Sequence, residues 1–115
     1  MKHSIGKAFT SGSAQLVFEV PAGYVAHVDL VYITNTSGST GTYTIDWRHA
    51  HNSYADIIRF AYGKSLGSGS SDQFSNGLLV MKSNDRMYVN PSMTVDVIVS
   101  FDLLKAPPLY SFDGE

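Results

Sequence analysis

The chain has 115 residues, a formal net charge of −2 and no cysteine. This length suits one domain, and the lack of cysteine excludes disulfides, thiolate zinc sites and a cysteine nucleophile. Eight Lys and Arg against ten Asp and Glu give no basic excess for binding nucleic acid, and no apolar run is long enough for a membrane-spanning helix.

Alternation of apolar and polar residues with period two predicts β-strands along the first half of the chain. Residues 1–9 form either a weak strand or an arm, and strands are predicted over 14–20, 24–34 and 42–49. The last two flank the Ser-, Thr- and Gly-rich residues 37–41, which predicts that they pair as a hairpin.

The second half continues the pattern with shorter strands at 57–62, 78–81 and 87–89, and with a long strand at 94–104. A polar turn separates 78–81 from 87–89, so these two strands are predicted to form a second hairpin. The Gly- and Ser-rich residues 64–71 are expected to form the most mobile internal loop.

No segment shows the apolar stripe of an amphipathic helix. About eight short strands separated by turns therefore predict an all-β fold, a single antiparallel β-sandwich of jelly-roll or immunoglobulin-like type over residues 1–105. The residues expected in its core are Leu16, Phe18, Val28, Leu30, Ile45, Trp47, Val97, Val99 and Phe101.

The last ten residues, 106–115, are predicted to form an extended C-terminal arm. Two successive prolines hold the backbone extended and prevent it from joining the interior of a sheet. The large apolar side chains that follow favour burial, either on their own domain or on a neighbour. The contact residues expected in the arm are Pro107, Pro108, Leu109, Tyr110 and Phe112.

Motifs that would support catalysis or metal binding are incomplete. His49 and His51 share one face at a strand end but lack a third ligand, so no metal site is predicted. Residues 63–65, G-K-S, end like a phosphate-binding loop, yet Ile58 occupies the position of the required glycine and no helix follows. With no nucleophile elbow and no paired carboxylates, we expect neither catalytic residues nor a cofactor.

A binding surface is the alternative to a purely structural role. Exposed aromatic residues can line a sugar-binding face on a β-sandwich, whereas Tyr43 and Trp47 are expected to face the core. The residues that could form a ligand or contact surface are Tyr54, Tyr62, Lys64 and Tyr88. The alternative hypothesis is therefore a carbohydrate- or receptor-binding module with a host-surface glycan as its ligand.

Short segments follow one another in a distinctive order: V-P-A-G at 20–23, N-T-S-G-S-T-G at 35–41, G-S-G-S-S at 67–71, G-L-L-V at 77–80 and V-D-V-I-V-S at 95–100. This order resembles that of small β-sandwich structural proteins of tailed bacteriophages. The likeness spans residues 14–101. At 82–85, K-S-N-D stands where the family often has a turn like E-A-G-D, which is a conservative departure.

The resemblance implies a non-enzymatic virion structural protein, either a decoration or cement protein of the head or a component of the neck or tail. Its implied partners are copies of itself, as a homo-oligomer, and other virion proteins such as the major capsid, neck or tail proteins, without nucleic acid or membrane. The implied location is the virion, assembled in the host cytoplasm. An arm with apolar anchors suits such a subunit, because it gains order by burial on a neighbour.

Overall fold

The computed structural model describes residues 2–50, 53–75 and 79–106, and nine β-strands lie within these ranges. The strands are β1 (Lys2–Phe9), β2 (Gln15–Glu19), β3 (Tyr24–Asn35), β4 (Gly41–Arg48), β5 (Ile57–Leu66), β6 (Ser71–Phe74), β7 (Leu79–Met81), β8 (Arg86–Pro91) and β9 (Val95–Lys105). Across the described ranges no helix is long and apolar enough to cross a membrane.

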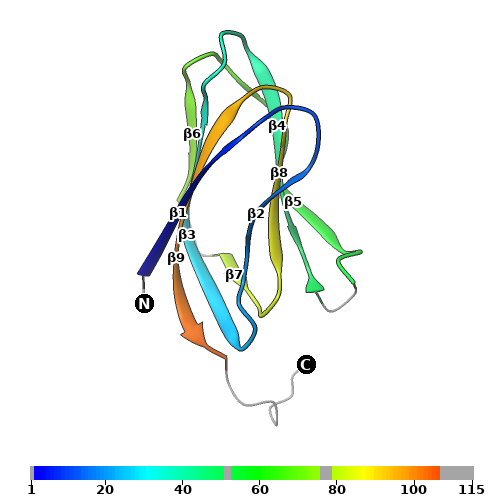
Figure 1. Ribbon diagram of the computed structural model, residues 1–115, viewed down its shortest axis with the longest axis vertical. Coiled ribbons are helices and arrows are strands. Elements are labelled where there is room, and N and C mark those ends of the chain that lie inside the picture. The colour runs from blue at the N-terminus through cyan, green and yellow to red at the C-terminus, as the bar shows by residue number, and fades with distance from the viewer. Residues whose placement is uncertain (1, 51–52, 76–78, 107–115) are drawn as a thin grey trace.

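The strands form two antiparallel sheets that pack against each other (Figure 1). One sheet has the order β1-β9-β3-β6, with β7 also paired to β3, and the other has the order β2-β8-β4-β5. With β6 and β7 counted as one interrupted strand, this is the strand order of an eight-stranded jelly roll. The predicted all-β sandwich is confirmed, and of the two types that the sequence left open the structure has the jelly roll.

Most connections cross from one sheet to the other. β3 and β4 lie in different sheets, and so do β7 and β8, so both hairpins predicted from the sequence are wrong. The consecutive strands that do pair as a hairpin are β4 and β5. The hairpin predictions failed because alternation requires only that one face of a strand meets the core, and a strand in either sheet satisfies that requirement.

β-Bulges in β2 and β3 change which face of the strand meets the core. The register of β2 against β8 shifts between Leu16 and Phe18, so Phe18 and Val17 are both buried while Leu16 is 38% exposed. A second shift follows Val28 in β3 and leaves Leu30 only partly buried. The expectation that Leu16 and Leu30 belong to the core is therefore wrong, since alternation does not reveal an inserted residue.

The core lies between the sheets and takes side chains from both of them. The rings of Phe18 in one sheet and Phe101 in the other stack with their centroids 4.9 Å apart. Trp47, which the sequence also placed in the core, is instead partly buried and packs against the core from its margin. The core residues that the sequence predicted correctly are Phe18, Val28, Ile45, Val97, Val99 and Phe101.

The Gly- and Ser-rich stretch has more regular structure than expected. β5 continues to Leu66, which is buried, and β6 begins at Ser71, so the turn is confined to residues 67–70. The predicted loop 64–71 is thus wrong at both ends, because Leu66 packs in the core and anchors its strand.

At the N-terminus, β1 pairs with β9 along its whole length, so these residues form a strand and not an arm.

Neighbouring substitutions in β2 test the bulge. We expect Val17→Ala to lower the free energy of unfolding by about 1.5–3 kcal/mol, because it removes methyl groups that are fully buried. Leu16→Ala should lower it by less than about 1 kcal/mol, because that side chain is largely in water. Denaturant titration of the two variants measures the difference, and a larger loss for Leu16→Ala would contradict this placement of the bulge.

Candidate functional site

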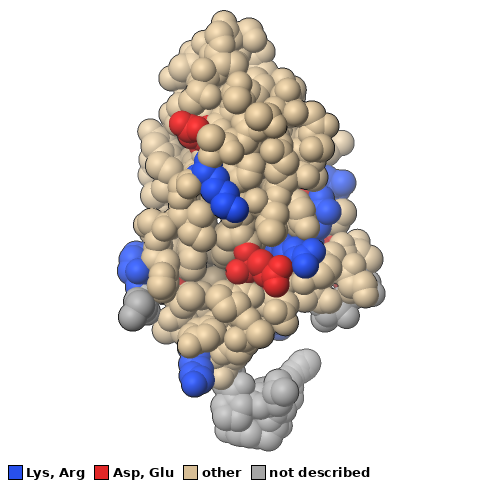
Figure 2. Space-filling model, in the orientation of Figure 1, with Lys and Arg blue, Asp and Glu red and all other residues tan. Residues whose placement is uncertain are grey.

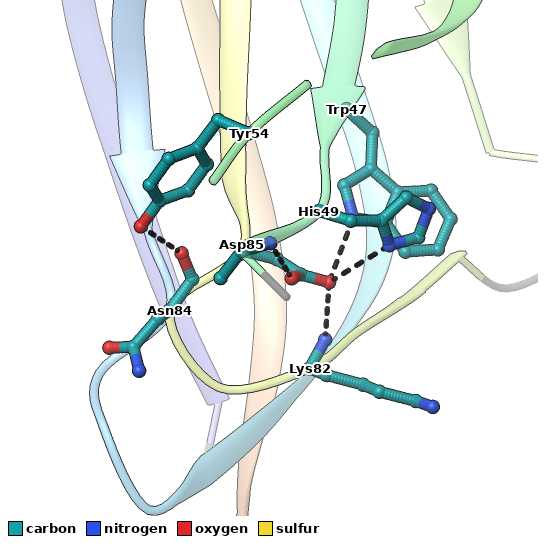
Figure 3. Close-up of polar contacts among 7 residues, drawn as sticks. Trp47, His49, Tyr54, Lys82, Asn84 and Asp85 are labelled. Carbon is teal, nitrogen blue, oxygen red and sulfur yellow. Dashed lines mark hydrogen bonds and ion pairs between the residues drawn. The ribbon is translucent and has the colours of Figure 1, made fainter. Parts of the chain in front are cut away.

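The turn between β7 and β8 holds a buried carboxylate at which separate chain segments meet (Figure 3). Asp85 is 3% exposed. Its carboxylate accepts hydrogen bonds from Trp47 Nε1, from the Lys82 amide and from the Ala50 amide, each at 3.0 Å. Nδ1 of His49 lies 3.8 Å from the same carboxylate. One side chain therefore fastens the end of β4, and the residues that follow it, to the β7–β8 turn.

Backbone hydrogen bonds extend this junction to the residue after β2. The Val20 amide donates to the Asp85 carbonyl at 2.9 Å, and the Asn84 amide donates to the Val20 carbonyl at 2.9 Å. Asn84 has a φ of 68°, in the left-handed region that asparagine adopts more readily than most residues. We call this set the Asp85 junction: Val20, Trp47, His49, Ala50, Lys82, Asn84 and Asp85.

A depression of about 640 Å³ opens beside the Asp85 junction, and Ser83 also lines it. The Asp85 oxygens accept from three donors of the protein, and the Ser83 hydroxyl donates to the Tyr24 carbonyl at 2.6 Å. The Asp85 carboxylate and the Ser83 hydroxyl are thus engaged in structural hydrogen bonds, and His49 and Lys82 also line the depression. The hydrogen bonds of Asp85 therefore hold separate segments of the chain together at the edge of the depression.

The two histidines considered from the sequence separate at this point. His49 lies against the indole of Trp47, with the ring centroids 4.5 Å apart, while His51 lies outside the described residues. Among the residues that the structure describes, no group of three His, Cys, Asp or Glu side chains could hold a metal ion.

A second cluster lies beside the junction, on β4, on β8 and in the turn between β4 and β5. The guanidinium of Arg86 lies 3.9 Å from the ring centre of Tyr54, and that of Arg48 lies 4.0 Å from the ring centre of Tyr88. In each stack the positive group faces the negative face of the aromatic ring. The Tyr54 hydroxyl also donates to the Asn84 carbonyl at 3.0 Å, which joins the cluster to the Asp85 junction (Figure 3). We call Arg48, Tyr54, Arg86 and Tyr88 the Tyr–Arg patch.

Acidic residues hold both arginines of the patch. Arg86 Nε donates to Glu19 Oε1 at 2.9 Å, and Arg48 Nε donates to Asp46 Oδ1 at 2.9 Å. Hydrogen bonds to Tyr88 and to Glu19 raise the pKa of Arg86. Arg48 and Arg86 face each other across β4 and β8, so the acidic partners offset the repulsion between two like charges. The two arginine charges of the patch are therefore each offset by a neighbouring carboxylate.

The structure brings together two of the four contact residues predicted from the sequence. Tyr54 and Tyr88 meet at Arg86, whose Nη1 donates to the Tyr88 hydroxyl at 3.4 Å. Tyr62, 76% exposed, and Lys64 lie on β5 and take no part in the patch. Sequence reasoning missed the two arginines, because only the strand order shows that β4 and β8 are neighbours.

Lys64 belongs to a third polar group, which links the two sheets. Its Nζ lies 3.7 Å from the Asp72 carboxylate in β6, and the Tyr43 hydroxyl in β4 donates to the same carboxylate at 2.6 Å. β4 and β6 belong to opposite sheets, so this bond ties the sandwich together at its margin. Burial, with the hydrogen bond to Asp72, raises the pKa of Tyr43 well above its ordinary value, because a phenolate there would be desolvated beside a carboxylate.

The predicted arm lies outside the described residues, and with it Pro107, Pro108, Leu109, Tyr110 and Phe112. The described chain ends at Ala106, whose amide donates to the Gly23 carbonyl at 2.8 Å. The sandwich therefore holds the backbone as far as Ala106.

Comparisons with known proteins find chains of similar fold among solved structures. No family model matches the sequence, and no curated protein matches it. A chain in the acidic stable capsid structure of Helicobacter pylori bacteriophage KHP30 is similar with a TM-score of 0.60 and 11% identity, over 93% of this chain and 94% of that one. A chain in the crystal structure of the T13 IBDV viral particle has a TM-score of 0.57 and 7% identity, over 91% of this chain and 31% of that one. At these identities the likeness establishes a shared fold.

Removing the carboxylate tests the Asp85 junction. We expect Asp85→Ala to lower the free energy of unfolding by about 3 kcal/mol or more, because three donors lose their acceptor. Trp47 is the single tryptophan of the chain, so its emission should shift to the red as the junction opens. Asp96→Ala is the matched control, because that exposed carboxylate should change stability by about 0.5 kcal/mol or less. Equal stability of the two variants would contradict a structural role for Asp85.

The raised pKa of Tyr43 predicts a loss of stability at alkaline pH. The folded state holds the phenol proton more tightly than the unfolded chain, so this contribution is complete below the ordinary tyrosine pKa of about 10 and is lost as the pH rises above it. We expect Tyr43→Phe to have a free energy of unfolding about 1–2 kcal/mol lower than that of the unaltered chain at pH 7. On going to alkaline pH, the variant should lose less of its free energy of unfolding than the unaltered chain does. Denaturation of both proteins across this range is the measurement, and parallel curves would contradict the assignment.

Proposed function

We propose that this chain is a non-enzymatic structural subunit of a bacteriophage particle, assembled in the host cytoplasm, and that it acts through contacts with copies of itself and with other particle proteins. The observation that carries the proposal is the match to a chain in a phage capsid structure, which covers 93% of this chain and 94% of that one. A match of this extent compares one jelly roll with another of similar size. It supports a structural role in the particle, and we propose that this role is that of a decoration or cement protein of the head or of a component of the neck or tail.

The Tyr–Arg patch supplies the contact chemistry that this proposal needs. Tyrosine and arginine are enriched among the residues that contribute most to protein–protein binding. Here the stacks and the ion pairs with Glu19 and Asp46 hold the side chains in one arrangement, so a partner need not order them. We therefore assign the patch as a contact surface for another protein of the particle.

The same geometry favours a protein partner over a glycan. A sugar-binding platform needs open aromatic faces, whereas Tyr54 and Tyr88 each have a guanidinium stacked on the ring. Tyr62 is exposed but lies apart from both of them on β5. A receptor-binding module is thus the weaker of the two hypotheses formed from the sequence.

We further propose that residues 1–105 form the sandwich domain and that the segment beyond it is an arm that attaches the subunit to a neighbour. Its anchors Leu109, Tyr110 and Phe112 each contribute about 1.5–3 kcal/mol on burial. Ordering the backbone of the arm costs roughly 1 kcal/mol or more for each residue. The balance favours order only where a neighbouring protein adds further contacts.

Composition analysis of purified particles tests the proposed function. Mass spectrometry of gradient-purified phage particles should find this chain at a fixed ratio to the major capsid protein, because a structural subunit is present in a defined number of copies. Recovery of the chain only from the soluble fraction of the lysed host would contradict the proposal.

Truncation after Ala106 tests the arm separately. Deleting residues 107–115 should leave the melting temperature of the protein nearly unchanged, because the bond from Ala106 to Gly23 is kept. Incorporation into particles should fall. Full incorporation of the truncated chain would contradict the role of the arm, and loss of folding would show that the segment packs on its own domain.

A further inference from the structure

One end of the sandwich has no charged residue in any of its turns. Four turns meet there: residues 10–14 between β1 and β2, 36–40 between β3 and β4, 67–70 between β5 and β6, and 92–94 between β8 and β9. These turns consist of Ser, Thr, Gly, Ala and Met, so none of the four contains a charged side chain. Figure 2 shows the consequence on the visible face, where the upper part of the molecule carries neither blue nor red atoms. We call these four turns the charge-free end.

Buried Asn35 fixes two of these turns relative to each other. Its side-chain amide donates to the Ser39 and Leu66 carbonyls, both at 2.9 Å. Its backbone amide donates to the Ser70 carbonyl, and its carbonyl accepts from the Gly69 amide, again both at 2.9 Å. The β3–β4 and β5–β6 turns are therefore held as one unit.

The other two turns are fastened to the same unit. The Thr36 amide donates to the Thr94 carbonyl at 3.1 Å, which joins the β3–β4 turn to the β8–β9 turn. The Gly12 amide donates to the Pro91 carbonyl at 3.1 Å, which joins the β1–β2 turn to the end of β8. The whole end thus keeps one shape, and a partner that binds it has little loop entropy to remove.

The surface at the charge-free end is also uneven, with a groove and a projecting turn into which a partner can fit. A groove of about 450 Å³ begins at this end, at Ser11, Gly12 and Ser92, and continues along β4 and β8. The residues of these strands that line it are also uncharged: Thr42, Thr44, Asn90 and Pro91. The β3–β4 turn projects at the extreme of the molecule (Figure 1). A projection and a hollow on the same end are what copies of one chain need in order to interlock about an axis.

We propose that the charge-free end is the surface through which copies of this chain contact one another around a rotation axis. Rotational symmetry brings the same residues of every copy together, so a lysine or an aspartate there would meet its own like charge. A hydroxyl group both donates and accepts hydrogen bonds, so surfaces rich in Ser and Thr can bond to identical surfaces. A soluble surface ordinarily mixes charges of both signs, and the opposite end does so with Glu19, Lys82 and Arg86.

This inference rests on the proposed function only for the expectation of many symmetric copies. The self-contact is tested in solution, and the virion role is tested by particle composition, so the two fail separately. A protein that self-associates as described but is missing from particles would overturn the proposed function alone. A monomer found in particles would overturn the inference alone.

Charge placed at the end provides the experiment. Ser39 is exposed in the β3–β4 turn, and the hydrogen bonds described for it use its backbone atoms. Sedimentation velocity at low ionic strength should show a concentration-dependent oligomer for the unaltered chain. Ser39→Asp and Ser39→Lys should each weaken it, by about fivefold for each pair of like charges brought to contact distance. An equal mixture of the two variants should restore association. Ala22→Asp, in the exposed β2–β3 turn at the opposite end, is the matched control and should associate like the unaltered chain.

Chemical cross-linking provides a second experiment for the case in which a charged variant fails to fold. The chain has no cysteine, so Ser39→Cys introduces a single thiol. A short bismaleimide should join copies of Ser39→Cys efficiently and copies of Ala22→Cys poorly. An unaltered chain that stays monomeric, equal cross-linking at the two ends, or charged Ser39 variants that associate normally would each overturn the inference.

Discussion

One buried polar side chain at each end of the sandwich holds the crossings between the sheets. A jelly roll passes repeatedly from sheet to sheet, so at each end its backbone leaves the strand ladders and needs other hydrogen-bond partners. Asp85 meets that need at one end for the residues after β2, β4 and β7. Asn35 meets it at the other end for the β3–β4 and β5–β6 turns. Burying Asp85 or Asn35 without these hydrogen-bond partners would cost free energy of folding. Each residue therefore disfavours other topologies, in which its partners would be missing.

The two ends share this construction but differ in the surfaces that they support. Around Asp85 the fastened segments carry the Tyr–Arg patch, in which arginine, tyrosine and carboxylate are paired in advance. Around Asn35 the fastened turns carry no charge at all. A charged, aromatic surface suits a different partner, and an uncharged hydroxyl surface suits another copy of itself. A subunit that uses the two at once is connected both to its own kind and to the particle.

The sequence predicted the fold class because alternation and turn residues act locally. Phe18, Val28 and Val99 were placed correctly in the core on that basis alone. Leu16 was not, because the bulge before Phe18 depends on pairing with β8, which is distant in the chain. The same limit explains the missed site: Arg48 and Arg86 become neighbours only through the strand order, and Asp85 reads as an ordinary turn residue until its partners are known.

Cryo-electron microscopy of the intact particle tests the central claim most directly, because it shows the subunit, its symmetry and both surfaces together. The account predicts jelly-roll density in several symmetric copies, with residues 36–40 of each copy turned toward a shared rotation axis and the Tyr–Arg patch covered by another particle protein. Copies that are present with the charge-free end facing solvent on every side would contradict the account of self-contact. Particles without this density would contradict the assignment of the chain as a virion subunit.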